Sequence, residues 1–264
     1  MNRLQDAKRI VFKVGTSTLT HDTGKLNLRR MRDLARVLSD LKNAGREIVL
    51  VSSGAIGVGV GKLKLERRPH DIGGRQACAA VGQCELMYIY DKLFSEYGHV
   101  TAQVLLTRDC VDDRLRRMNI QNAFERLLDM GALPIVNEND TVAVEEIVFG
   151  DNDTLSALVA REVHADALVI LTDIDGLYEQ NPRENPEAKL IHMVEEITPH
   201  IREIAGGTGS SRGTGGMITK IEAADIATRE GIVTAIIDGS DPDNLYRLLD
   251  GEKIGTVFCA HREG

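Results

Sequence analysis

The sequence has no long block of basic residues and no long apolar run. No run of lysine and arginine exceeds two residues, and the 264-residue chain carries a net charge of −8. A basic patch or stripe is the footprint of a nucleic-acid-binding protein. A membrane-spanning helix needs about 20 consecutive apolar residues. We therefore expect neither nucleic acid nor a membrane among the partners of this protein.

Cysteine is also scarce. The four cysteines, Cys78, Cys84, Cys110 and Cys259, form no C-x-x-C pair and show no metal-binding spacing. This pattern predicts reduced, largely buried thiols, and the sequence singles out no metal ligands. Residues 1–6 contain no signal-peptide apolar segment. The expected location is the cytoplasm.

Several familiar catalytic motifs are missing. The Gly61-Lys62 pair has isoleucine where a Walker A loop needs its first glycine, and G-x-G-x-x-G occurs nowhere between a strand and a helix. The seven histidines are scattered and none lies beside a candidate nucleophile, which argues against a hydrolase triad. If the protein binds a nucleotide, it does so through another type of site.

Apolar strands and amphipathic helices alternate along the chain, which is typical of a parallel α/β sheet. With no linker or repeat, we expect residues 1–264 to form a single domain. Expected strands cover residues 9–15, 47–51, 100–106, 132–137, 167–173, 190–193, 232–237 and 256–258, the last as an edge strand. Expected helices cover residues 28–45, 71–98, 113–130, 154–163, a short stretch after 199, 217–229 and 243–250, with polar or glycine-rich loops at 16–18 and 52–59.

Polar residues gather where the expected strands end. Lys13 lies near the end of the first strand, Ser53 and Gly54 follow the second, and an Asn-Glu-Asn-Asp cluster at 137–140 follows the fourth. Ligands of open α/β sheets bind outside the carboxyl ends of the strands. These residues are therefore candidate ligand contacts, although Lys13 alone is equally well explained as a lysine that reaches solvent.

The segment Gly150-Asp-Asn-Asp-Thr154 precedes the helix expected over 154–163. One of its polar side chains suffices to cap the helix. Two carboxylates and an amide exceed what a cap needs, and a helix start also attracts ligands. We favour a ligand site here over capping alone.

A glycine-rich stretch at 206–216 leads into the helix expected over 217–229, with Lys220 one turn in. Bare amides before a helix can hold phosphate, although such a stretch can also be a linker and Lys220 a surface lysine. Lys13 and Lys220, held by a carboxylate such as Asp153, would suit phosphoryl transfer, which requires positive charge around the transferring oxygens.

Six segments stand out along the chain: FKVGTS at 12–17, VSSGAI at 51–56, NEND at 137–140, FGDND at 149–153, LTD at 171–173 with GLY at 176–178, and TGGM at 214–217 with Lys220. Together they resemble the amino-acid kinase family over essentially the whole chain. They resemble in particular the branch that phosphorylates the γ-carboxylate of L-glutamate, the first step of proline synthesis. The resemblance implies a three-layer α/β/α sandwich around a mainly parallel sheet of about eight strands. Its N-terminal half would bind the acceptor and its C-terminal half ATP.

The resemblance also implies roles for individual residues. Lys13 and Lys220 would stabilise the transferring phosphoryl group, with Asp153 orienting both lysines. Glutamate would be held by Ser53, Gly54, Asp140, Asp151 and Asn152. ATP, with Mg²⁺, would contact Lys13, Thr172, Asp173, Thr214, Gly215, Gly216, Met217, Ile218, Thr219 and Lys220. The product would be L-glutamyl 5-phosphate, and the ionised acceptor needs no general base.

The resemblance leaves alternatives and departures. Many members carry a further C-terminal PUA domain, which we do not expect in these 264 residues, and Ile218 stands where the family often has serine. Homo-oligomers (a dimer or a tetramer) and feedback inhibition by L-proline are expected from the family. Relatives acting on N-acetylglutamate, aspartate or uridylate are the nearest rivals, followed by a non-catalytic nucleotide-binding protein. Asp140 and Asp151 favour an acceptor with a free amino group.

Overall fold

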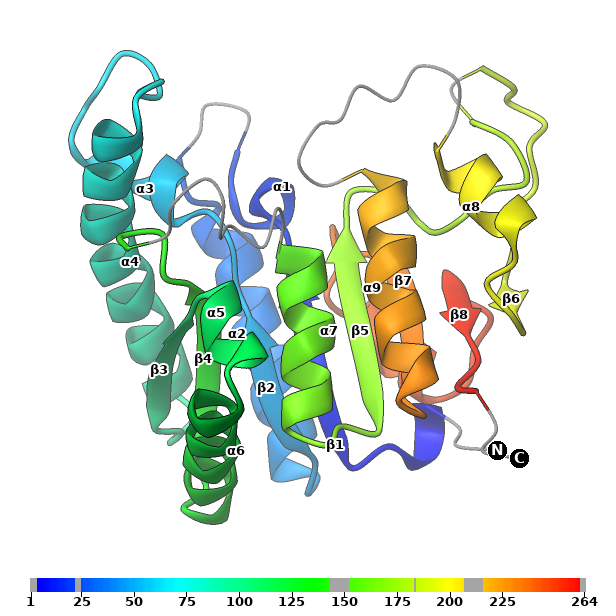
Figure 1. Ribbon diagram of the computed structural model, residues 1–264, viewed down its shortest axis with the longest axis horizontal. Helices are drawn as coiled ribbons and strands as arrows, with labels where there is room; N and C mark the ends of the chain where they lie inside the picture. Colours follow the sequence, from blue (N-terminus) through cyan, green and yellow to red (C-terminus); the bar gives the residue numbers. More distant parts are fainter. Residues whose placement is uncertain (1–3, 22–24, 143–151, 183, 207–215, 262–264) are drawn as a thin grey trace.

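A computed structural model describes residues 4–21, 25–142, 152–182, 184–206 and 216–261. In these residues the chain forms one sheet of eight strands, in the order β3-β4-β2-β1-β5-β7-β8-β6 (Figure 1). The strands are β1 Arg9–Val14, β2 Glu47–Val51, β3 Thr101–Leu106, β4 Leu133–Glu138, β5 Ala167–Thr172, β6 Met193–Val194, β7 Val233–Asp238 and β8 Thr256–Phe258.

Every strand pair is parallel except β7 with β8. The fold expectation, a mainly parallel sheet of about eight strands, is confirmed. The expected closing strand β8 exists, but it is not the edge, because β6 pairs with its outer side. Since β1 lies between β2 and β5, Lys13 near its end is at the middle of the sheet.

Helices cover both faces of the sheet. They are α1 Thr16–Leu19, α2 Leu28–Asn43, α3 Ala55–Lys62, α4 Ile72–Ser95, α5 Arg108–Asp112, α6 Arg114–Asp129, α7 Asn152–Glu162, α8 Pro199–Gly206, α9 Met217–Arg229 and α10 Asn244–Leu249, with a 3₁₀ turn at Leu4–Asp6. Apolar side chains of α2, α4 and α10 form one core, and those of α6, α7 and α9 form the other. Figure 1 shows α7 and α9 side by side, both beginning near the edge where β5 ends.

Alternation along β1 assigns its side chains to the two faces. Ile10, Phe12 and Val14 belong to the core under α2, whereas Val11 belongs to the core under α7 and α9. Lys13 follows Val11 by two residues and therefore points to the same face as α7 and α9. The strand register thus brings a lysine to the two helices that carry Asp153 and Lys220.

Three helices were not predicted. Residues 16–18, expected as a loop, lie in the single turn of α1, and α5 precedes the expected helix at 113–130. The glycine-rich stretch 52–59 was expected to be a loop, but most of it lies in α3. One of its glycines, Gly59, serves packing, because a side chain there would meet the Cys78 carbonyl of α4, and a side chain on Gly82 of α4 would meet the Ala55 carbonyl of α3. The backbones of α3 and α4 therefore approach closely.

Two expectations for helices need adjustment. Helix α7 begins at Asn152, so Asn152 and Asp153 lie inside its first turn rather than before it. The buried face of α4 includes the polar residues Gln83 and Tyr90, whereas Cys84, a cysteine expected to be buried, and Tyr88 are exposed. None of the helices in the described ranges is both long enough and apolar enough to cross a membrane.

Candidate active site

Two lysines converge on one carboxylate where β1, α7 and α9 meet. The Nζ of Lys13 lies 2.5 Å from Oδ1 of Asp153, and the Nζ of Lys220 lies 3.1 Å from Oδ2. Lys13 comes from a strand, whereas Asp153 and Lys220 come from the first turns of two neighbouring helices. We refer to these three residues as the lysine–aspartate triad.

The triad is almost completely buried. The side chains of Lys13 and Lys220 are 7% and 4% exposed, and that of Asp153 is fully buried. Burial by itself raises the pKa of Asp153, but the two ammonium groups outweigh it, so the pKa lies below its usual value. Two ammonium charges against one carboxylate leave the triad with a net positive charge. Such a buried charge is stabilised when an anion binds beside it.

Thr219 joins the triad to the start of α9. Its hydroxyl lies 2.8 Å from Oδ2 of Asp153 and 2.8 Å from the carbonyl of Gly216, the residue before the helix. The Nζ of Lys220 also lies 3.5 Å from that carbonyl. The N-terminal end of α9 and the triad are therefore one connected unit, and a helix N-terminus favours anions.

A chain of amides forms the neighbouring part of the site. The side-chain amide nitrogen of Asn152, with two N–H donors, lies within hydrogen-bond distance of three acceptors: the Ser52 carbonyl at 2.6 Å, Ser53 Oγ at 2.9 Å and Asn137 Oδ1 at 2.9 Å. These bonds tie the start of α7 to the ends of β2 and β4. Ser53 and Asn152, both predicted glutamate contacts, are thus brought together.

Buried polar residues of α4 extend this chain and were missed from the sequence. Gln83 Oε1 accepts from the amide of Asn137 at 2.9 Å, and the hydroxyl of Tyr90 lies 2.8 Å from Ser52 Oγ. Asn137 could be noticed in the sequence, because it opens the polar cluster at the end of β4. Gln83 and Tyr90 carried no such signal, since they lie among apolar residues of a long helix.

The other predicted acceptor residues, Gly54, Asp140 and Asp151, are not among the hydrogen bonds described above. Gly54 precedes α3 with a φ of 94°, a left-handed conformation that suits glycine. Asp140 is partly buried, and burial raises its pKa despite the opposing charge of Arg68. Asp151 lies outside the described residues. The geometry leaves the roles of all these residues as predictions.

Apart from Lys13 on β1, the predicted nucleotide contacts that the structure describes lie at the C-terminal end of β5 and at the start of α9. Thr172 is buried and its hydroxyl donates to Asp173 at 3.1 Å, while Asp173 itself is exposed. Met217 and Ile218 open α9 and are half-buried. Thr214 and Gly215 lie outside the described residues.

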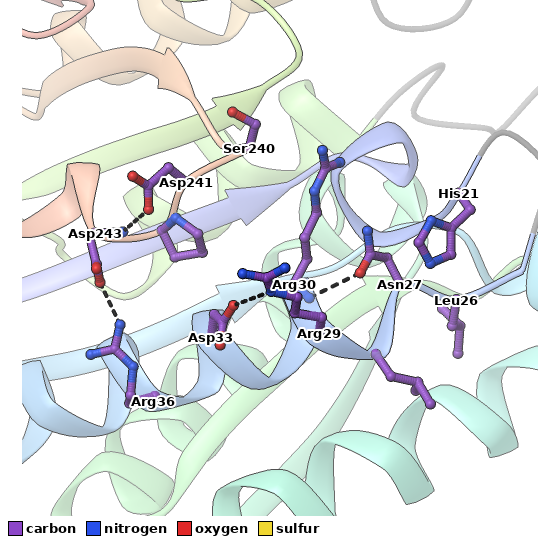
Figure 2. A pocket seen from close by; sticks show the side chains of 12 residues that line it. His21, Leu26, Asn27, Arg29, Arg30, Asp33, Arg36, Ser240, Asp241 and Asp243 are labelled. Atoms are coloured by element: carbon purple, nitrogen blue, oxygen red, sulfur yellow. Dashed lines mark hydrogen bonds and ion pairs between the residues drawn. The ribbon is translucent and has the colours of Figure 1, made fainter.

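A cavity of about 760 Å³ lies elsewhere, between the start of α2 and the loop before α10 (Figure 2). None of the predicted site residues lines it. Its charged side chains largely neutralise one another, because Arg36 pairs with Asp243 at 2.5 Å and Arg29 lies 3.9 Å from Asp33. The triad, with its net positive charge, lies outside this cavity.

The protein side chains do not assemble a metal site of their own in the described ranges. No group of three His, Cys, Asp or Glu residues there is close enough to hold an ion. Mg²⁺ that accompanies a nucleotide needs only phosphate oxygens, water and at most one or two carboxylates.

The sequence matches the model of the amino acid kinase family over residues 8–238. The chain belongs to the amino acid kinase family. Among its relatives are the glutamate 5-kinases of Clostridium perfringens, 56% identical over 98% of both chains, and Listeria monocytogenes, 52% identical over 98% of this chain and 96% of the relative. Both of these relatives are named as glutamate 5-kinases.

Two solved structures share the fold. They are the UMP kinase of Bacillus anthracis, with a TM-score of 0.64, 15% identity and 97% coverage of both chains, and the isopentenyl phosphate kinase of T. acidophilum. The latter has a TM-score of 0.65 and 17% identity over 95% of this chain and 99% of the other. At such low identity these structures support the fold alone.

Proposed function

We propose that this chain transfers the γ-phosphoryl group of ATP to the γ-carboxylate of L-glutamate. The product is L-glutamyl 5-phosphate, and the reaction is the first step of proline biosynthesis. The observation that carries the proposal is the lysine–aspartate triad, in which two buried ammonium groups share one carboxylate. The identity to glutamate 5-kinases over nearly the whole chain supports the choice of substrate.

In the proposed reaction, Lys13 and Lys220 surround the oxygens of the transferring phosphoryl group. A lone pair on a γ-carboxylate oxygen of glutamate forms the new O–P bond while the bond to the ADP oxygen breaks. Asp153 holds the two ammonium groups apart and directed at the same point. The acceptor carboxylate is already ionised at neutral pH, so no general base is required. The protein contributes position and charge, as phosphoryl transfer requires.

We assign the nucleotide to the edge formed by Thr172, Asp173 and residues 214–220. ATP is the co-substrate, and Mg²⁺ bound to its phosphates neutralises part of their charge. The start of α9 lies next to the triad, because the Thr219 hydroxyl lies 2.8 Å from both Asp153 Oδ2 and the Gly216 carbonyl. The helix end would therefore attract the phosphates toward both lysines.

We assign the acceptor to Ser53, Gly54, Asp140, Asp151 and Asn152. Asp140 favours an acceptor with a free α-amino group, because burial disfavours its charged form and an ammonium partner would offset that cost. An acetylated amine offers no positive charge. This argument selects glutamate over N-acetylglutamate.

The proposal extends to organisation. We propose that residues 1–264 act as one kinase domain, with the acceptor in the N-terminal half and ATP in the C-terminal half. We propose a homo-oligomer, a dimer or a tetramer, for which the exposed apolar side chains of Tyr88 and Val100 are suitable contacts.

The proposed location is the cytoplasm. All four cysteines are free thiols, which suits the reducing cytoplasm. Feedback inhibition by L-proline is part of the proposal.

Trapping the product tests the reaction. The protein is incubated with MgATP and hydroxylamine, which converts acyl phosphates to hydroxamates, together with L-glutamate, N-acetyl-L-glutamate or L-aspartate. We expect hydroxamate with L-glutamate and little with the other two acids. Hydroxamate with another acid would change the substrate and keep the mechanism. No hydroxamate from folded, ATP-binding protein would contradict the proposal.

A further inference from the structure

We infer that Gln83 of α4 is a positioning residue for the acceptor: through Asn137, it fixes the direction of the Asn152 amide. The inference rests on the proposed function, in which Asn152 contacts glutamate. Gln83 itself lies one residue further from the acceptor, behind Asn137. Its side chain is buried and comes from a helix that contributes no residue to the triad.

Backbone groups at two points of the chain of amides fix which atom is oxygen and which is nitrogen. The backbone N–H of Glu138 donates to the Asn137 side chain at 2.9 Å, so the atom facing it must be the acceptor Oδ1. The backbone carbonyl of Ser52 accepts from Asn152, so that atom must be Nδ2. Both assignments agree with the bond from Asn152 Nδ2 to Asn137 Oδ1.

The remaining atom of the Asn137 amide is then Nδ2, which requires an acceptor. Gln83 Oε1 provides it at 2.9 Å. Each amide in the series Gln83, Asn137, Asn152 therefore orients the next. With its nitrogen directed at the strand ends, Asn152 has Oδ1 on the opposite side, where it can accept from the α-ammonium group of glutamate.

The helix that carries Gln83 is held firmly against the acceptor loop. Gly82 lets α4 approach the Ala55 carbonyl of α3, and α3 begins directly after Gly54. Two turns further along α4, Tyr90 bonds Ser52. Helix α4 thus contacts the proposed acceptor site through two buried polar side chains. Tyr90 bonds Ser52, and Gln83 bonds the side-chain amide of Asn137.

The substitution Gln83→Met keeps an unbranched side chain of similar length and removes the acceptor. Asn137 Nδ2 then lacks its buried partner, and rotation of that amide to find another weakens the bond to Asn152. We expect KM for glutamate to rise about five- to tenfold, while KM for ATP stays within about twofold. A merely structural role would shift the melting temperature and leave the ratio of the two KM values unchanged.

A double-mutant cycle in the full chain separates this inference from the proposed function. KM for glutamate and for ATP are measured in wild type, Gln83→Met, Asn152→Ala and the double variant, with exposed Cys84→Ser as the control on α4. We expect Asn152→Ala to raise KM for glutamate and to abolish the effect of Gln83→Met.

The outcomes are distinguishable. If Asn152→Ala leaves KM for glutamate unchanged, the acceptor assignment fails. If Asn152→Ala raises it and the Gln83→Met factor persists undiminished in the double variant, the acceptor assignment stands and the role of Gln83 is wrong. Equal changes in both KM values for Gln83→Met would also overturn the inference.

Discussion

Helix α7 carries a buried carboxylate in its first turn and another at its last residue, and each is held by two cations. Asp153 binds Lys13 and Lys220 near the strand ends. Glu162 binds Arg117 of α6 and Arg161 of α7, at 2.7 and 2.8 Å, and accepts from Gln121 at 2.8 Å. Charge and burial of the two carboxylates are alike, but their surroundings differ.

The difference lies in the cations. Arg117 and Arg161 have side chains 41% and 23% exposed, so their excess positive charge reaches water. The lysines at Asp153 are nearly fully buried. Arginine engages a carboxylate with a planar fork, whereas an ammonium group is a compact charge with three donors. The arginine pairs suit a fixed tie between α6 and α7, whereas the lysine pairs suit a site that receives an anion.

The largest difference in kcat is expected between substitutions of the two carboxylates themselves. Asp153→Asn removes the charge that holds both lysines, and we expect kcat to fall by about 10³-fold. Glu162→Gln weakens only the tie between helices, so kcat should stay within about threefold while the free energy of unfolding falls by about 2 kcal/mol. Steady-state kinetics and urea unfolding of both variants measure these effects. Equal losses of kcat would break the comparison.

The cations give the next largest effect. Lys220→Ala removes one proposed donor to the transferring phosphoryl group and should lower kcat by at least ~10²-fold. Arg117→Ala is the matched variant at the other end of α7 and should leave kcat nearly unchanged. Turnover is measured at saturating glutamate and ATP. Near-normal turnover of Lys220→Ala would remove the proposed mechanism.

Substitutions of the neutral hydrogen-bond donors to Asp153 and Glu162 should differ less in their effect on kcat. Thr219→Val removes the hydroxyl that donates to Asp153, and we expect kcat to fall about three- to tenfold, the value of one hydrogen bond. Gln121→Leu removes the corresponding donor to Glu162 and should affect only stability. A larger kcat loss for Gln121→Leu than for Thr219→Val would contradict the assignment of roles.

The smallest effect concerns pH. The folded-state pKa of Asp153 is lowered, so its ionised form stabilises the fold at any pH above ~4, the pKa of aspartate in the unfolded chain. That contribution is lost as the pH falls through the lowered folded pKa. Below pH ~4, the free energy of unfolding measured with urea should therefore fall more steeply with decreasing pH for wild type than for Asp153→Asn. If the free energy of unfolding fell equally with pH in the two proteins, the ionisation of Asp153 would not contribute to stability in this way.

The sheet could be predicted from the sequence because its strands are short apolar runs between turn signals. Lys13 stood out as a cation within such a run, and its direction follows from the alternation along β1. The small helices were harder. The glycines of α3 indicate a loop when read locally, and only the contact with α4 reveals that Gly59 allows the two backbones to approach.

The candidate site was predictable only in part. Nothing in the local sequence joins Lys13 to Lys220, since they are 207 residues apart and meet through the order of the strands. The family resemblance supplied that link. Gln83 escaped because one polar residue in an apolar helix gives no periodic signal, and its role depends on a hydrogen bond to a distant strand end.

Isotope transfer tests the central claim most directly. L-glutamate labelled with ¹⁸O in its γ-carboxylate is converted with MgATP, the product is trapped with hydroxylamine, and the released phosphate is examined by ³¹P NMR. Direct attack of the carboxylate on the γ-phosphorus of ATP predicts one ¹⁸O atom in each phosphate. Unlabelled phosphate, or label in AMP, would contradict the account.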